Sequence, residues 1–250
     1  MVYYMQNQKL QVIEIIRRIE DCATRPFLCR CDDDELYVVK GMPCVPKKQL
    51  IAEWISAHLA KQIGISLPEF RIVYVDQILV EYIPDWKKDL HEGYAFATKY
   101  IPNVAPITFN QAHNNVEILD QKNIYLFDKW IKNADRTLSP HGGNPNIIYE
   151  LANNQHYLID HNLAFDHDDV DEMFEQHVYS PLHRDWIFDF VDKETAERTT
   201  IQAKSILKQV ITTIPDEWSL DDEDMHNRLI TFINNTVNRV ESEEFWRELT

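Results

Sequence analysis

The stretch from Asn123 to Phe165 constrains the fold and the chemistry of this chain more than any other. It begins with an apolar-faced helical pattern that includes Ile124, Phe127 and Trp130. A polar loop follows, and then two short β-type runs joined by a turn, the second of which, YLID, ends on an acid. This order predicts a loop held between a helix and a hairpin, where functional side chains are commonly placed.

Carboxylate and amide side chains gather in and after this loop, at Asp135, Asn144, Asn146 and Asp160. Oxygen ligands of this kind suit a hard cation such as Mg²⁺, which proteins usually share with substrate phosphates. Phosphoryl transfer uses such a set, with an acid near the acceptor hydroxyl and an Asn and an Asp on the metal. NADRT alone could also be a helix end and a turn. The ordered combination of NADRT, NPN and LID favours the chemical interpretation.

The phrases FDKWIKNADRT, NPNII and LIDHNLAF resemble the catalytic segment of the HipA-like kinases, whose loop is a variant of the protein-kinase catalytic loop. The resemblance implies that Asp135 is the catalytic base and that Asp160 holds metal. It further implies that Asn144 is the metal-binding Asn, with Asn146 as the second candidate. By motif the resemblance covers roughly residues 24 to 164.

The spacing of two of these residues departs from the family. Relatives place the Asn five positions after the Asp, whereas nine positions separate Asp135 and Asn144 here, because of the segment LSPHGG. Gly142 and Gly143 can adopt positive φ at no steric cost and could loop the additional residues outward. Such a loop would restore the geometry of Asp135 and Asn144.

Two β-type runs, PFLCRC and ELYVVK, precede a helical pattern from Gln49 to Ile63. The second run ends on Lys40, which is costly to bury unless its ammonium meets an anion. It could instead extend into water from the strand end. The resemblance implies that Lys40 contacts the α- and β-phosphates of ATP and pairs with Glu53 of the helix.

An acidic turn, Asp32–Glu35, joins these two runs. Kinase folds usually cover the nucleotide phosphates with glycine and backbone N–H groups, whereas this turn offers four carboxylates. The carboxylates would repel ATP unless Mg²⁺ or a reorientation intervenes. A solvated turn that points away from the nucleotide is the alternative, and a nucleotide-binding but inactive protein stays compatible with the sequence.

Two further runs, FRIVYV and QILVEY, predict a hairpin around Asp76 and Gln77. After them, the phrase FATKYIP resembles the hinge of the family. The resemblance implies that the backbone near Tyr100 and Ile101 meets the adenine edge.

The resulting prediction is an α+β, two-lobed, protein-kinase-like fold. The N-lobe, over residues 1–101, is expected to be a small antiparallel sheet with one key helix. The C-lobe, over residues 102–250, is expected to be mainly helical and to carry the catalytic loop.

Helical periodicity is also expected over residues 8–21, 193–213 and 224–240. Trp218 and Trp246 are expected to pack as core or rim aromatics. The acidic segment from Asp166 to His177 lacks the Gly and the bidentate Glu of a calcium loop and is interpreted as a solvated turn.

The composition fits one or two globular domains, since the 250 residues are 44% hydrophobic and include only 5 Gly. Lys and Arg total 25 against 41 acids, which gives a formal charge of −16. Such a surface disfavours general nucleic-acid or anionic-membrane binding, although a local basic patch is compatible with it. No export signal or long apolar run is present, so we expect a soluble, cytoplasmic protein.

The four cysteines, Cys22, Cys29, Cys31 and Cys44, are expected to be free thiols in a reducing cytosol. Cys29 and Cys31 share strand parity and should point to the same side. No CxxC pair supports zinc, and a metal cluster of Cys29, Cys31 and Cys44 is the less favoured alternative.

Three functions follow from the sequence, and the oligomeric state is left open. The favoured one is ATP- and Mg²⁺-dependent transfer of the γ-phosphoryl group to Ser or Thr of a protein, because every role of that reaction is assigned to a residue. A small-molecule kinase and a pseudokinase-like nucleotide-binding or protein-interaction module are the alternatives. The motifs GxSxG, HExxH and GxxxxGK[ST] are absent, which removes serine hydrolases, zincins and P-loop NTPases.

Overall fold

The computed structural model describes residues 10–20, 22–81, 83, 85–166, 171–247 and 249. The chain divides into two compact units. Unit 1 contains the chain up to Leu50, Pro68–Ile101 and Pro215–Ser219, and unit 2 contains Ile51–Leu67, Pro102–Ile214 and the chain from Leu220 onward. The predicted lobes were residues 1–101 and 102–250. Residues 51–67 of the predicted N-lobe belong to unit 2, and residues 215–219 of the predicted C-lobe belong to unit 1.

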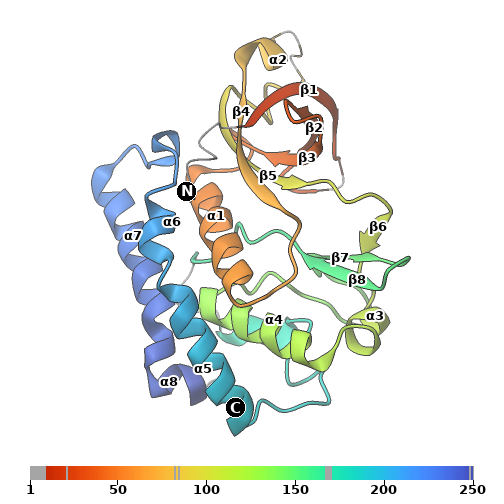
Figure 1. Cartoon of the computed structure of the whole chain (residues 1–250), viewed down its shortest axis with the longest axis vertical. Coiled ribbons are helices and arrows are strands. Elements are labelled where there is room, and N and C mark those ends of the chain that lie inside the picture. Colours follow the sequence, from red (N-terminus) through yellow and green to blue (C-terminus); the bar gives the residue numbers. More distant parts are fainter. Residues whose placement is uncertain are drawn as a thin grey trace, which may run out of the picture. The chain divides into compact units, whose positions relative to one another are not determined.

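Unit 1 is built on a closed five-stranded barrel (Figure 1). Its strands, in the order of pairing, are β1 (Leu10–Arg18), β2 (Phe27–Cys31), β3 (Leu36–Lys40), β5 (Gly93–Lys99) and β4 (Phe70–Val75). All neighbours are antiparallel except β1 and β4, which are parallel. The expected small antiparallel sheet is therefore corrected to a barrel with one parallel pair, a closure that removes the open sheet edges.

The helix predicted over residues 8–21 is wrong in its described part, because this part forms β1. Two register shifts interrupt the pairing of β1 with β2. A bulge adds one residue to a strand, so the inward-facing positions no longer recur at a strict period of two. Leu10, Val12 and Ile15 contact the core, whereas Ile13 and Ile16, which continue the helical spacing from Leu10, are exposed.

The strand predicted for QILVEY is also wrong, because Gln77–Glu81 form the short helix α2. The Oδ1 atom of Asp76 accepts a hydrogen bond from the N–H of Ile78 at 2.9 Å, which satisfies a free donor of the first helical turn. Val80 packs from α2 into the barrel core. The antiparallel partner of β4 is β5 instead.

The barrel core consists mainly of aliphatic side chains and thiols. The buried members are Val12, Phe27, Cys29, Cys31, Tyr37, Val39, Val73, Val75, Val80, Leu90, Ala95 and Ala97. Cys29 and Cys31 both point inward, as their parity predicted, and all four cysteines are free thiols. In β3, Tyr37 and Val39 face the core, so Lys40 lies on the outer face of the strand.

Unit 1 also includes the 3₁₀ turn η2 (Asp216–Trp218), which is sequence-distant from the barrel. The Nε1 atom of Trp218 donates to the carbonyl oxygen of Tyr94 in β5 at 3.0 Å. The N–H of Tyr94 in turn donates to the Glu217 carboxylate at 2.8 Å. These bonds attach the turn to β5, and Trp218 is fully buried, as expected.

Helix α1 (Lys47–Gln62) begins in unit 1 and continues into unit 2, and it confirms the helix predicted over residues 49–63. Unit 2 also contains an antiparallel sheet of β6 (Val104–Pro106), β7 (Ile147–Glu150) and β8 (Gln155–Leu158). Its other helices are α3 (Phe109–Asn114), α4 (Ile118–Ile131), α5 (Phe190–Lys204), α6 (Leu207–Ile211), α7 (Glu223–Asn238) and α8 (Glu243–Arg247), with 3₁₀ turns η1 (Asp171–Gln176) and η3 (Arg239–Glu241).

The C-terminal helices agree with the sequence except for one break. The helix predicted over residues 193–213 is divided into α5 and α6, whereas α7 and η3 confirm the helix predicted over residues 224–240. The fully buried Trp130 of α4 donates from Nε1 to the carbonyl oxygen of Val237 in α7 at 2.9 Å. This contact joins the helix that leads into the predicted loop to the C-terminal helices (Figure 1).

Part of the acidic segment, residues 167–170, lies outside the described residues. In the parts of the chain that the structure does describe, no helix is both long enough and apolar enough to cross a membrane.

Candidate active site

Helix α4 ends immediately before the candidate site. Lys132 adopts a left-handed conformation with φ of +56°, and its N–H donates to the carbonyl oxygens of Asp128 and Lys129. The N–H of Asn133 also donates to the Asp128 carbonyl oxygen, at 2.8 Å. A left-handed residue of this kind ends a helix and satisfies its last carbonyls. The turn directs the chain into the loop that carries Asp135.

Asp135, Asn144 and Asn146 converge in this loop. The Nδ2 atoms of both Asn side chains donate to Oδ2 of Asp135, each at 2.9 Å. Within the described part of the chain, the side-chain oxygens of the two amides accept no hydrogen bond. The amides therefore hold one carboxylate oxygen and leave their own oxygens available to another group.

The Asp135 carboxylate is electrostatically coupled to its surroundings. Burial raises the pKa of Asp135 above its ordinary value, and the hydrogen bonds from Asn146 and Asn144 oppose this shift. The negative charge of Asp160 raises the same pKa further. The two acids that the sequence assigns to one reaction are thus close enough for the charge of Asp160 to affect the pKa of Asp135.

The residues that separate Asp135 from Asn144 form a loop that closes on itself. The N–H of Thr137 donates to the carbonyl oxygen of Asn144 at 2.9 Å, and the N–H of Asn144 donates to Oγ1 of Thr137 at 3.2 Å. A Cβ at Gly143, whose φ is +159°, would lie 2.5 Å from the carbonyl oxygen of Thr137. Glycine permits this close approach, and Asn144 returns to Asp135 as expected.

A fully buried ionic network, which was not predicted from the sequence, lies behind the loop. The Nε atom of Arg136 donates to Oδ2 of Asp128 at 2.7 Å, and neither side chain is exposed. Nε2 of His177 lies 2.9 Å from the same oxygen, and Asn133 donates to Oδ1 at 2.9 Å. Burial alone would raise the pKa of Asp128, but the charge of Arg136 and the bond to His177 hold it below its ordinary value. The available signal was an acid four residues after Ile124, on the apolar face of α4.

Arg136 also fixes the two segments that carry the other site residues. Its Nη1 atom donates to the carbonyl oxygens of Asn146 and Ile159. The N–H of Ile159 donates to the Asn146 carbonyl oxygen at 3.0 Å. Asn146 and Asp160 have φ of +46° and +60°, a left-handed conformation that Asn and Asp adopt more readily than other L-residues. One guanidinium therefore positions the backbone at Asn146, the second candidate for the metal-binding Asn, and at the residue before Asp160.

Glu53 lies beside the Asp160 segment. Its side chain is buried, and Oε2 accepts a hydrogen bond from the N–H of His161 at 3.0 Å. This bond ties α1 to the residue that follows Asp160. The sequence predicts that Glu53 pairs with Lys40; because Lys40 belongs to unit 1, the pairing stays a prediction.

The remaining predicted residues lie on the barrel of unit 1. Lys40 closes β3, and Tyr100 and Ile101 directly follow β5. The N–H of Tyr100 donates to the carbonyl oxygen of Leu36 at 2.8 Å, which extends the pairing of β3 and β5 by one residue. The contacts of these residues with the phosphates and the adenine stay predictions.

The acidic turn Asp32–Glu35 has partners within unit 1. Asp33 accepts hydrogen bonds from the N–H of Glu35 and from the hydroxyl of Tyr37, at 3.1 and 2.8 Å. Glu35 forms an ion pair with Lys99 at 3.0 Å. Part of the negative charge of this turn is therefore balanced by Lys99 at the surface of the barrel.

Comparison with known proteins identifies the family and the fold. A family model described as HipA-like kinase matches residues 12–249. The crystal structure of the Helicobacter pylori proinflammatory kinase CtkA is similar with a TM-score of 0.56 at 12% identity, covering 96% of each chain. The chain thus shares its fold, a combination of sheet and helices, with a kinase.

Two other solved kinases are more distant. HipA, in a complex of Shewanella oneidensis MR-1 HipA, HipB and operator DNA, has a TM-score of 0.48 at 13% identity, covering 94% of this chain and 72% of that one. A Golgi casein kinase with Mn and ADP bound has a TM-score of 0.45 at 13% identity, covering 93% and 72%. No curated protein sequence matches the chain significantly.

Proposed function

Because the chain belongs to the HipA-like kinase family, we propose that it transfers the γ-phosphoryl group of ATP to a Ser or Thr hydroxyl of a protein in a Mg²⁺-dependent reaction. Membership of this family supports phosphotransferase activity in general. The observation that carries the proposal is the convergence of Asn144 and Asn146 on Asp135, with the Asp160 charge close enough to raise the Asp135 pKa.

In this proposal Asp135 acts on the acceptor hydroxyl. The two amides hold Oδ2, which leaves Oδ1 to accept the hydrogen bond of the hydroxyl and then its proton. The raised pKa makes the carboxylate a stronger base than an exposed Asp. Arg136, which binds the chain on either side of the cluster, supports Asp135 without contacting the acceptor.

The donor set fits Mg²⁺. The described residues contain no group of three or more His, Cys, Asp or Glu side chains that could hold a metal ion. The set consists instead of the Asp160 carboxylate and the amide oxygens of Asn144 and Asn146, hard ligands of the type that Mg²⁺ shares with phosphates. When bound, the cation would neutralise charge on the phosphate oxygens.

The proposal assigns the nucleotide to residues of both units. Lys40 would contact the α- and β-phosphates and pair with Glu53, and the backbone at Tyr100 and Ile101 would meet the adenine. These roles require the two-lobed arrangement of a kinase, which is part of the proposal. The outer-face position of Lys40 and its strand-end location support it, because the ammonium is not enclosed in the barrel core.

The decisive experiment compares Asp135→Asn with the parent protein. We expect phosphoryl transfer to fall by about 10²- to 10⁴-fold, because the acid acts on the acceptor. ATP binding in the presence of Mg²⁺, measured by calorimetry, should stay within about twofold. A Glu194→Gln variant, which removes an exposed acid of α5, is the matched control. Normal turnover by Asp135→Asn would refute the assigned role.

A nucleotide-binding module without transfer is the second candidate, and the glycine-free acidic turn Asp32–Glu35 favours it. Thermal unfolding with ATP and Mg²⁺, followed by radiolabel transfer, separates the two. A ligand that binds only the folded protein raises its unfolding temperature by mass action. A shift without transfer to any protein supports the module, whereas transfer that is lost in Asp160→Ala supports the kinase. Transfer to metabolites with hydroxyl groups, but not to protein, would identify a small-molecule kinase.

A further inference from the structure

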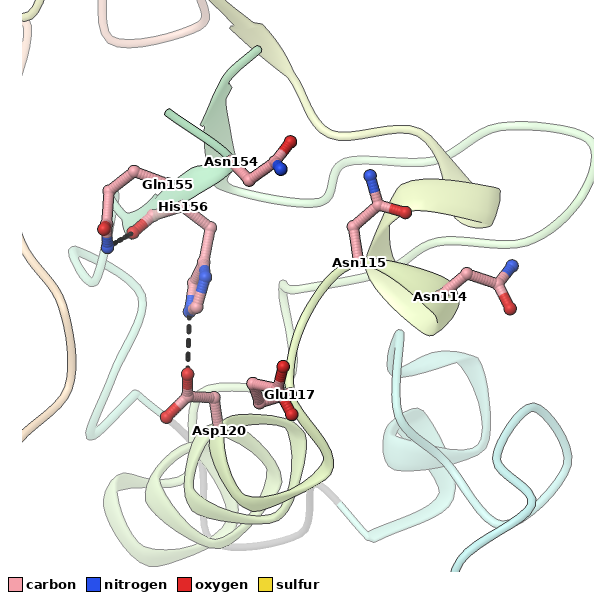
Figure 2. A pocket seen from close by; sticks show the side chains of 7 residues that line it. All are labelled: Asn114, Asn115, Glu117, Asp120, Asn154, Gln155 and His156. Carbon is pink, nitrogen blue, oxygen red and sulfur yellow. Dashed lines mark hydrogen bonds and ion pairs between the residues drawn. The ribbon is translucent and has the colours of Figure 1, made fainter. Parts of the chain in front are cut away.

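A polar pocket of about 540 Å³ lies in unit 2, apart from the Asp135 cluster. It is formed by the end of α3, the start of α4 and the turn between β7 and β8 (Figure 2). Its lining residues are Asn114, Asn115, Glu117, Asp120, Asn154, Gln155 and His156. None of them is apolar, which distinguishes this pocket from the mainly apolar sites of most small molecules.

Hydrogen bonds between the walls hold the pocket open. The Nδ2 atom of Asn115 donates to the hydroxyl of the buried Tyr149 at 3.0 Å. That hydroxyl donates to Oδ1 of Asn154, also at 3.0 Å. The Nε2 atom of Gln155 donates to Oγ of Ser66 at 3.3 Å. The Gln155 amide nitrogen also donates to the carbonyl oxygen of His156 at 3.4 Å, so its donors and one donor of Asn115 are directed to the walls.

Most of the side-chain atoms of the lining that have no hydrogen bond to the described residues are acceptors. Within the described part of the chain, the side-chain oxygens of Asn115 and Gln155 accept no hydrogen bond, and neither do the carboxylates of Glu117 and Asp120. A lining rich in acceptors favours a ligand rich in donors. The two carboxylates further favour a cationic ligand.

His156 is the one basic side chain of the lining, and it does not neutralise the carboxylates. Its side chain is only 9% exposed, and Nε2 lies 3.9 Å from Oδ2 of Asp120, beyond hydrogen-bond distance. Figure 2 shows the ring directed at Asp120 across the pocket. Burial lowers the pKa of His156, with the Asp120 charge opposing, and therefore favours the neutral ring. A buried ring nitrogen is thus available to a ligand in the described structure.

We infer that this pocket, to which no role has been assigned so far, binds the guanidinium group of an arginine side chain from a partner protein. A guanidinium carries five N–H donors in one plane and stays charged at any physiological pH. Its donors suit carboxylate and amide oxygens, which are the acceptors that the lining offers. An anionic ligand is excluded by the charges of Glu117 and Asp120, and an apolar one by the lining.

The pocket and the Asp135 cluster lie at opposite ends of the same two elements. Asp120 is in the first turn of α4, and the helix spans about 17 Å from there to Ile131. His156 and Asp160 are four residues apart, or about 13 Å if extended. An extended peptide covers such a distance with about four or five residues. If the proposed function holds, the arginine belongs to the acceptor protein and lies at this separation from the accepted hydroxyl.

The binding test needs no phosphoryl transfer. Nα-acetyl-arginine amide is titrated into the full chain, and the side-chain amide NMR signals of Asn115, Asn154 and Gln155 are followed. We expect saturable shifts, and at least tenfold weaker binding of the citrulline analogue, which has the same shape without the charge. Asp120→Asn and Glu117→Gln should each weaken binding at least threefold, whereas Glu194→Gln should not. Equal binding of arginine and citrulline, or undiminished binding by the double variant Glu117→Gln/Asp120→Asn, overturns the inference.

A second arm links the pocket to the proposed function. Alanine-based peptides with one Ser and one Arg, separated by two to seven residues, are compared as acceptors. We expect kcat/KM to be highest at a separation of about four or five residues and to lose that preference in Asp120→Asn. Absence of transfer to every acceptor contradicts the proposed function alone, because the titration still decides whether the pocket binds arginine.

Discussion

The Arg136 side chain has no exposed surface and forms all its hydrogen bonds inside unit 2. A charge in such a place is stable only while its partner is present, because an unpaired buried charge keeps the full cost of leaving water. Asp128 supplies the countercharge, and His177 and Asn133 saturate its oxygens. Stability and site geometry therefore depend on the same residue.

We predict that Arg136→Met lowers the free energy of unfolding by about 3–5 kcal/mol, because it leaves Asp128 buried and unpaired. The double variant Arg136→Met/Asp128→Leu should recover a large part of this loss. Urea unfolding of both variants measures the difference. The matched control is Arg30→Met, which breaks an exposed pair with Glu14 and should cost less than about 1 kcal/mol. Equal losses of unfolding free energy in Arg136→Met and Arg30→Met would contradict a larger contribution of the buried pair to stability.

The residues of the Asp135 cluster could be predicted from the sequence, whereas Arg136, which positions the backbone around them, could not. Asp135, Asn144 and Asp160 could be found because they stand in a fixed order with recognisable neighbours. Arg136 stands next to Asp135, and besides Asp128 its partners are backbone carbonyl oxygens, among them those of Asn146 and Ile159. Backbone oxygens carry no sequence signal, so contacts of this kind become visible only in a structure.

Among the elements, the loop between Asp135 and Asn144 gives the sharpest test. Gly143→Ala would place a Cβ 2.5 Å from the Thr137 carbonyl oxygen, whereas a Cβ at Gly142 meets nothing within 4 Å. Both glycines have positive φ, so Gly142→Ala is a control for backbone strain alone. We predict that Gly143→Ala lowers phosphoryl transfer at least tenfold more than Gly142→Ala, because it displaces Asn144 from Asp135. Similar activities of the two variants would exclude a positioning role for the close approach.

Shortening the same loop should be tolerated. Deletion of residues 139–142 removes the tip, whose first and last residues pair with each other, and restores the spacing of the family. We predict that the shortened protein keeps phosphoryl transfer within about threefold, since closing a shorter loop changes its entropy only slightly. Initial rates of the deletion variant and the parent protein test this. A loss as large as that of Asp135→Asn would assign a direct role to the tip.

The elements that the sequence mispredicted share a physical cause. β1 and α2 are both set by contacts distant in sequence: β1 by bulged pairing with β2 and by its parallel pairing with β4, and α2 by the burial of Val80 in the barrel core. Local periodicity is a poor guide where a strand is irregular or a helix is only five residues long. α1, α4 and α7 were predictable because each has 14 or 16 residues, with apolar side chains at helical spacing.

For the whole molecule, buried histidines set the response to acid. Burial lowers the pKa of His58 to about 4, and it also lowers the pKa values of His113, His156 and His177. Below about pH 6.5 the unfolded chain takes up protons that the folded chain does not. Each such proton lowers the free energy of unfolding by about 1.4 kcal/mol per pH unit. The protein should therefore lose stability progressively as the pH falls from about 6.5 to 4.

Unfolding midpoints in urea at pH 7.5, 6 and 5 measure this dependence. We predict that the midpoint decreases at each step, and that His58→Phe, which keeps an aromatic ring against Trp54, makes the decrease smaller. The same substitution at the exposed His141 is the matched control. A midpoint that does not change between pH 7.5 and pH 5 would contradict the assignment of neutral buried histidines.

The left-handed backbone at Asn146 and Asp160 has a consequence for genetics. In a saturation library, most L-residues at these two codons would be depleted even in a screen that reads only protein abundance, because they strain the backbone. Glycine would survive that screen and fail one that reads growth or activity. The difference between the two screens for the glycine variants therefore measures the contribution of the side chains, separately from the conformational requirement of the backbone. The φ of Asn144 is not left-handed. At this position the abundance screen should therefore not favour glycine over other residues.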